Sequence, residues 1–106
     1  MRRGEVWWAE LPPPAGLRPV VLLSRDEAYT VRSLVIVCPV TTRIRGIPSE
    51  VPLGPDDGLV RDSVANLDVI TTIAKTSLRE RIAALRPAKL RAVDAAIHFA
   101  LGLRDA

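Results

Sequence analysis

Prolines divide this sequence into short apolar segments that are rich in strand-forming residues. Residues 4–11 favour a strand, and the three prolines at 12–14 end it because a proline cannot donate a hydrogen bond to a strand ladder. The uninterrupted apolar run at residues 20–23 predicts a strand that is buried on both faces. The segments predicted as strands, five to seven in number, lie within residues 4–11, 18–24, 34–40, 47–53, 63–73 and 81–85.

Only the sequence after Pro87 has helical periodicity. Apolar residues recur there at intervals of three and four, which predicts a helix with one apolar face. They are Leu90, Val93, Ile97 and Leu101. Strands grouped first and a helix last predict an α+β fold, in which a small antiparallel β-barrel carries a C-terminal α-helix. The length predicts a single domain over residues 1–106.

Composition excludes several classes of protein. Apolar residues form 48% of the chain and charged residues 25%, which rules out intrinsic disorder. Cys38 is the only cysteine, so an internal disulfide framework is excluded. No apolar run approaches the roughly 18 residues that span a bilayer, and the N-terminus lacks the apolar region of a signal peptide. These features predict a cytoplasmic domain with no membrane association.

Most of the usual catalytic arrangements are missing from the sequence. His98, the only histidine, lies on the polar side of the predicted helix and is expected to be a solvated surface residue. Cys38 lies within an apolar strand and is expected to be a buried structural thiol. No glycine-rich phosphate loop follows a strand, and Asp56 and Asp57 lie in a sequence typical of a turn. The sequence therefore predicts no metal site and no cofactor.

Basic and hydroxyl side chains gather instead at the ends of predicted strands. Arg18 begins one apolar strand, Thr41 and Thr42 end another, and Arg43 and Arg45 follow in a turn. An arginine beside a hydroxyl can bind a phosphate and stabilise the charge that develops on it in a transition state. The alternative is that Arg18 makes a surface ion pair and the threonines make local hydrogen bonds. Residue types alone leave both interpretations open.

A series of short motifs runs along nearly the whole chain. They are GEVWWAEL at residues 4–11, RPVVLLS at 18–24, CPVTT at 38–42, GIPSEV at 46–51, DSVANLD at 62–68, TIAK at 72–75 and LGL at 101–103. In this order they resemble the MazF/PemK family of toxins, which are endoribonucleases of bacterial toxin–antitoxin modules. The resemblance implies an SH3-like barrel with a C-terminal helix, assembled as a symmetric homodimer. It also implies sequence-specific, metal-independent cleavage of single-stranded RNA, mainly mRNA.

The resemblance also implies roles for individual residues. The family's catalytic arginine falls on Arg18, and its catalytic threonine falls on Thr41. In the implied reaction the 2′-OH attacks the adjacent phosphorus and leaves a 2′,3′-cyclic phosphate and a 5′-OH end. Arg18 would stabilise the developing charge, and Thr41 would bind a phosphoryl oxygen. The residues expected along the RNA are Gly16, Thr42, Arg43, Arg45 and Asp68, although solvated turn positions are an equal alternative for Arg43 and Arg45.

The chain departs from the family pattern at two places that border the RNA groove in the family. The first loop is contracted to residues 12–17, and Val69 stands where the family often has glutamine. Both departures put the recognised RNA sequence in question. The implied protein partner is an antitoxin whose acidic, disordered tail folds across the groove on binding.

Two other functions compete with RNA cleavage. One is a toxin of the same fold that poisons DNA gyrase by protein contact, and the presence of both Arg18 and Thr41 argues against it. The other is a non-catalytic RNA-binding barrel, which would need aromatic stacking platforms. Aromatic residues form only 4% of the chain. Trp7 and Trp8 are adjacent in a strand and must face opposite sides, so at least one is expected in the core.

Overall fold

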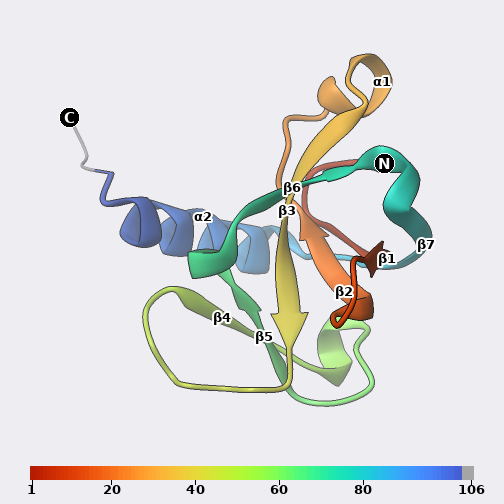
Figure 1. The fold of residues 1–106 in the computed structure, drawn as a ribbon. Helices are drawn as coiled ribbons and strands as arrows, with labels where there is room; N and C mark the ends of the chain where they lie inside the picture. Colours follow the sequence, from red (N-terminus) through yellow and green to blue (C-terminus); the bar gives the residue numbers. More distant parts are fainter. Residues whose placement is uncertain (104–106) are drawn as a thin grey trace.

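Seven strands and a C-terminal helix make up the fold in the computed structural model, which describes residues 1–103 (Figure 1). Residues 104–106 of the expected domain lie outside the described residues. The strands are β1 (Glu5–Leu11), β2 (Gly16–Leu22), β3 (Leu34–Thr41), β4 (Glu50–Leu53), β5 (Ser63–Asn66), β6 (Thr71–Ala74) and β7 (Leu78–Ala84). The helices are α1 (Ala28–Val31) and α2 (Pro87–Leu101), with 3-10 turns η1 (Pro55–Asp57), η2 (Leu67–Val69) and η3 (Lys75–Ser77).

All strand pairs in the sheet are antiparallel, and β3 is its centre. The strand order is β4-β5-β3-β2-β1-β7, with β6 paired to the first half of β3. Hydrogen bonding does not return from β7 to β4, so the sheet is barrel-like without being closed. The turn after β4 does pack closely on β7, because a Cβ at Gly58, after η1, would lie 2.7 Å from Ala83 Cβ. The expected α+β fold with an antiparallel sheet is confirmed.

The core has two parts because the sheet is covered on both sides. Val20 and Leu22 pack with Val35 and Val37 in one cluster. Val21 and Leu23 point the opposite way and join a larger cluster against α2. Successive residues of a strand face opposite sides, so an uninterrupted apolar run is what such a strand requires. The prediction of a strand buried on both faces at residues 20–23 is therefore confirmed.

Helix α2 crosses one face of the sheet (Figure 1). Pro87 occupies its first turn, and Gly102 ends it with φ +66°, a conformation that favours glycine. Val93 and Ala96 are buried against the sheet, and His98 is exposed as expected. Within residues 1–103 no helix combines the length and apolar character needed to cross a membrane.

Several element boundaries differ from the sequence-based expectation. The β-rich segment 63–73 is two strands, because the Asn66 side chain accepts a hydrogen bond from the Asp68 N–H and turns the chain at η2. Strand β4 starts only at Glu50, and β7 starts earlier than expected, at Leu78. Helix α1 was not expected from its polar surroundings. It is held by Tyr29, whose buried hydroxyl donates to the Ser24 carbonyl.

Candidate functional site

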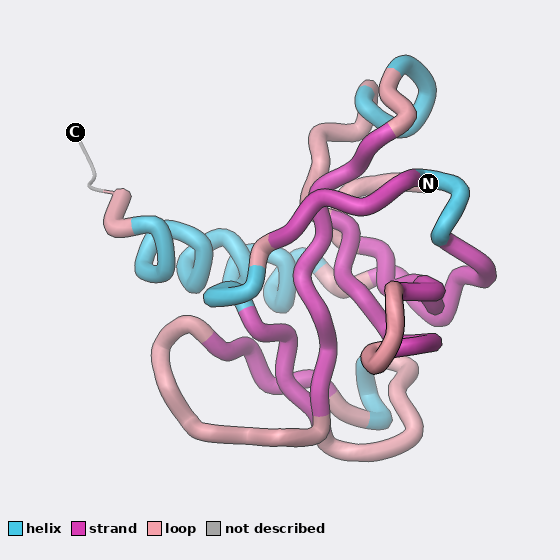
Figure 2. The backbone as a smooth tube through the Cα atoms, viewed as in Figure 1, coloured by secondary structure: helices cyan, strands magenta, loops and turns pink. Residues whose placement is uncertain are grey.

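A cleft of about 400 Å³ lies where β2 begins and β3 ends. These strand ends lie at the opposite end of the molecule from α1, near the loops that precede β4 and β5 (Figure 2). The cleft combines an apolar wall with polar groups at the strand ends. Its lining residues are Trp8, Leu17, Arg18, Pro19, Val40, Thr41, Thr42, Gly58, Leu59, Val60, Arg61, Ser63 and Ile82.

Strand register brings Arg18 and Thr41 to this cleft. The β2–β3 ladder pairs Leu22 with Val37 and ends where Val20 pairs with Pro39. The same register, carried two residues further, sets Arg18 opposite Thr41. On its other edge β3 pairs with β5, and there Thr41 lies opposite Val64. The β2–β3 ladder ends at Pro39, which cannot extend it with an N–H, so Arg18 and Thr41 lie beyond the last pair and both line the cleft.

Arg18 is exposed and held at one point only. Its Nε donates to the Ala15 carbonyl oxygen at 2.8 Å, which fixes the direction of the guanidinium. Within residues 1–103, Arg18 makes no ion pair with a carboxylate. The surface ion pair considered as an alternative from the sequence is therefore absent from that part of the chain. The planar guanidinium can use its two terminal nitrogens to bind two oxygens of an anion such as phosphate.

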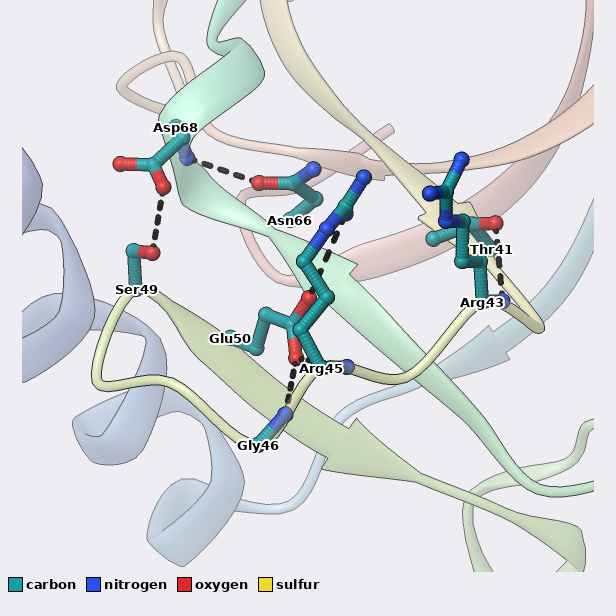
Figure 3. A network of polar contacts seen from close by, with 8 residues as sticks. All are labelled: Thr41, Arg43, Arg45, Gly46, Ser49, Glu50, Asn66 and Asp68. Atoms are coloured by element: carbon teal, nitrogen blue, oxygen red, sulfur yellow. Dashed lines mark hydrogen bonds and ion pairs between the residues drawn. The ribbon is translucent and has the colours of Figure 1, made fainter.

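Thr41 is half-buried and its hydroxyl is oriented by the backbone. Its Oγ1 accepts a hydrogen bond from the Arg43 N–H at 3.1 Å (Figure 3). A threonine hydroxyl can both accept and donate, so this contact leaves the O–H free to donate to a ligand in the cleft. The local hydrogen bond expected as the alternative role of the threonine does exist, and it is compatible with ligand binding.

The apolar wall contains a residue that sequence reasoning did not assign to the site. Trp8 lines the cleft, and its backbone pairs with Pro19, the residue next to Arg18. Trp7 faces the other side and packs against the core cluster that contains Val20. The adjacency of the two tryptophans indicated opposite faces, but only the position of β2 shows which of them meets Arg18.

The loop between β3 and β4, residues 42–49, carries the other predicted basic residues. Arg43 follows the cleft directly, whereas Arg45 is held by Glu50 at the start of β4 (Figure 3). At the far end of the loop, Ser49 Oγ donates to Asp68 Oδ2 at 2.6 Å. Hydrogen bonds therefore join the loop to β4 through Glu50 and to η2 through Asp68.

The predicted site residues fall into two groups. Arg18, Thr41 and Thr42 line the cleft, and Arg43 is bonded to Thr41. Gly16, Arg45 and Asp68 are not among the lining residues. Gly16 begins β2 with φ +66°, two residues before Arg18.

Buried acidic and thiol groups elsewhere have structural partners or apolar surroundings. Cys38 is buried, as expected for a structural thiol, and burial raises the pKa of its thiol to about 12. Asp57 accepts from the Gly54 N–H at 2.9 Å and lies near Arg86 and Lys89, as expected for a turn residue. Residues 1–103 contain no group of three His, Cys, Asp or Glu side chains arranged to hold a metal ion.

Comparison with known proteins finds one family along nearly the whole chain. The family model described as "PemK-like, MazF-like toxin of type II toxin-antitoxin system" matches residues 2–101. A "Probable endoribonuclease MazF5" of Mycobacterium tuberculosis (strain ATCC 25618 / H37Rv) is 42% identical over 100 residues, which cover 93% of this chain and 91% of that protein.

Two solved structures are similar in fold as well as in sequence. The Mycobacterium tuberculosis toxin MazF-mt6 matches with a TM-score of 0.88 and 32% identity, over 95% of this chain and 99% of that chain. An endoribonuclease from a mycobacterial species, solved in complex with its cognate antitoxin, matches with a TM-score of 0.89 and 30% identity. That match covers 100% of this chain and 99% of the other.

Proposed function

Because the chain belongs to the PemK-like, MazF-like toxins of type II toxin–antitoxin systems, we propose that it is a sequence-specific endoribonuclease that cleaves single-stranded RNA, mainly mRNA, in the cytoplasm. The observation that carries the proposal is the meeting of two groups in one cleft: the exposed guanidinium of Arg18, which has no ion pair within residues 1–103, and the backbone-oriented hydroxyl of Thr41. Both groups are suited to a phosphodiester, whose charge increases as the reaction proceeds.

The reaction we propose uses the substrate's own 2′-OH as nucleophile. Its oxygen forms a bond to the adjacent phosphorus, and the bond from phosphorus to the 5′ oxygen breaks. The 2′-OH loses a proton and the leaving 5′ oxygen gains one, so the products are a 2′,3′-cyclic phosphate and a 5′-OH. Arg18 stabilises the additional negative charge on the phosphoryl oxygens, and Thr41 donates to one of these oxygens and fixes its position.

The wall of the cleft suits an unstacked base. Single-stranded RNA is recognised by bases that are splayed out and stacked on aromatic side chains. Trp8 lies beside Arg18 and offers such a face, with Leu59 and Ile82 completing the wall. Thr42 and Arg43 follow Thr41 directly, and we assign them contacts to the RNA backbone. We also propose RNA contacts for Gly16, Arg45 and Asp68, which lie outside the cleft lining.

The partners that we propose are a second copy of the chain and a cognate antitoxin with an acidic, disordered tail. Exposed apolar side chains support the homodimer because they are costly to leave in water. They are Leu34 and Ile36 on β3 and Phe99, Leu101 and Leu103 at the end of α2. The exposed arginines of the cleft and loop support an acidic partner. The related endoribonuclease solved with its antitoxin supports the same choice.

The experiment that tests the reaction is cleavage of an RNA that contains one mapped site. We expect cleavage to persist in millimolar EDTA and to stop when the nucleotide 5′ to the scissile phosphate is 2′-deoxy. The deoxy substitution keeps the phosphate and the bases, so retained binding with lost cleavage isolates the chemical step. Continued cutting of the deoxy substrate at the same bond, or inhibition by EDTA, would contradict the mechanism.

The same preparation distinguishes the two competing functions. A non-catalytic RNA-binding barrel would retain a mixed RNA pool without producing new 5′-OH ends. A gyrase-poisoning toxin would neither bind nor cut the pool. Sequencing of the 5′-OH ends after incubation would also reveal the recognised sequence.

A further inference from the structure

Glu50 is a buried carboxylate beside the exposed loop that follows the cleft. Its side chain is only 2% exposed, although it stands at the start of β4 next to Ser49. Glutamate is almost never buried to this extent unless its charge is paired. The contacts of each carboxylate oxygen therefore indicate what the residue does.

One oxygen of Glu50 fixes the backbone of the loop. Oε1 accepts hydrogen bonds from the N–H groups of Arg45 and Gly46, each at 2.9 Å (Figure 3). Successive N–H groups in such a turn form a concave site for an anion, and Gly46 can take part because its φ is +72°. The protein's own carboxylate fills this site. An RNA phosphate can therefore meet the arginine side chains of the loop but not these two N–H groups.

The other oxygen of Glu50 has no hydrogen-bond donor. Within residues 1–103, Oε2 is the one buried side-chain oxygen or nitrogen without a partner. The nearby cation is the Arg45 guanidinium, whose Nη1 lies 3.8 Å away and whose side chain is 46% exposed. A buried charge that is paired but not bonded costs free energy, and a neutral glutamine could accept the same two N–H bonds without that cost.

We propose that Glu50 is a positioning residue, whose charge attracts the Arg45 guanidinium across 3.8 Å and so keeps its N–H groups directed toward a phosphate of the bound RNA. The planar guanidinium of arginine can face a carboxylate with one edge and a phosphate with another, whereas the compact ammonium group of lysine has no such edges. This inference rests on the proposed RNA cleavage and adds a residue outside the cleft to it. Glu50 acts on binding, not on the reacting phosphorus.

The test is the Glu50→Gln variant, assayed by kcat and KM for one RNA substrate. The glutamine oxygen can keep both N–H bonds, while its NH₂ group can no longer attract Arg45. We expect KM to rise about tenfold with kcat within about twofold, because the lost interaction concerns binding. The matched control is Glu27→Gln, which removes the same negative charge from an exposed residue beside α1, at the other end of β3. That control is expected to lower KM slightly or leave it unchanged.

Two variants of Arg45 complete the test. Arg45→Ala should raise KM by a factor similar to that of E50Q, and the double variant should raise it no further, because both changes remove one interaction. Arg45→Lys should also raise KM, whether or not E50Q folds, since lysine keeps the charge but lacks the planar guanidinium. The inference is overturned if E50Q lowers KM as E27Q does, or if R45K behaves as the unmodified protein. An unmodified protein that fails to cut RNA would instead contradict the proposed function.

Discussion

The cleft and the region around α2 use arginine in opposite ways. Near the helix, two arginines are paired with carboxylates. Arg3 Nη2 lies 2.6 Å from Oδ1 of Asp94 on α2, and Arg86 Nη2 lies 3.4 Å from Oδ1 of the buried Asp57. In the cleft, Arg18 is anchored only by a carbonyl oxygen and has no carboxylate partner within the described residues. The comparison indicates that the paired arginines stabilise the fold, whereas Arg18 remains available for a ligand.

Replacing Arg18 or Thr41 in the cleft should have the largest effect of all the variants. That effect should be a loss of activity without a loss of stability. Arg18→Ala is expected to lower kcat by roughly 10³-fold and Thr41→Ala by roughly 10²-fold, because each removes a donor aimed at the developing charge. The melting temperature should change by no more than a few degrees, since neither side chain is in the core. Single-turnover cleavage and calorimetry on the same samples measure both quantities.

The control for these variants is His98→Ala, a polar surface change on α2 that should leave kcat unchanged. Loss of cleavage in the histidine variant would move the chemistry to another part of the molecule. A large loss of stability in R18A would remove the contrast between the two regions.

Shortening a side chain on the buried face of α2 should have the reverse effect, which is a loss of stability with little change in activity. Val93 is fully buried, so Val93→Ala loses its contacts and leaves a cavity, at an expected cost of about 2 kcal/mol in the free energy of unfolding. Urea titration measures this loss. The kcat at 25 °C should remain within about twofold, and a much larger fall would show that the helix face and the cleft are coupled.

The aromatic wall of the cleft should affect binding more than chemistry. Trp8→Ala is expected to raise KM for RNA by about tenfold, which is the range for loss of one base–aromatic stack. Trp8→Phe keeps a ring and should restore most of the affinity. If the alanine variant binds RNA as well as the unmodified protein does, no base stacks on Trp8.

The smallest expected effect is on the pH dependence of stability, through Glu5 at the start of β1. Burial raises the pKa of Glu5, but hydrogen bonds from the Trp7 indole and the Arg2 N–H, together with nearby positive charges, leave it below the usual value of 4.5. A carboxyl with a lowered folded-state pKa stabilises the fold above its unfolded pKa and loses that contribution as the pH falls through the folded pKa.

The Glu5→Gln variant measures this contribution directly. The difference in unfolding free energy between the unmodified protein and the variant should be constant from pH 7 to about pH 5, and should shrink as the pH falls below 4.5. A difference that persists unchanged in acid would mean that the charge of Glu5 does not stabilise the fold.

Local pattern in the sequence determined much of the architecture. The apolar run at residues 20–23 could only be a strand with two covered faces, and the spacing after Pro87 could only bury one side of a helix. The same patterns placed Arg18 and Thr41 at the ends of strands. These features depend on neighbours within a few residues, so a single sequence contains them.

Only the tertiary structure decided which residues meet. The register of β2 on β3 brings Arg18 and Thr41 to the same cleft, just beyond the last pair of that ladder. The place of β1 beside β2 decides that Trp8, and not Trp7, lines that cleft. Strand order and register arise from contacts between residues that are distant in sequence, and no local periodicity encodes them.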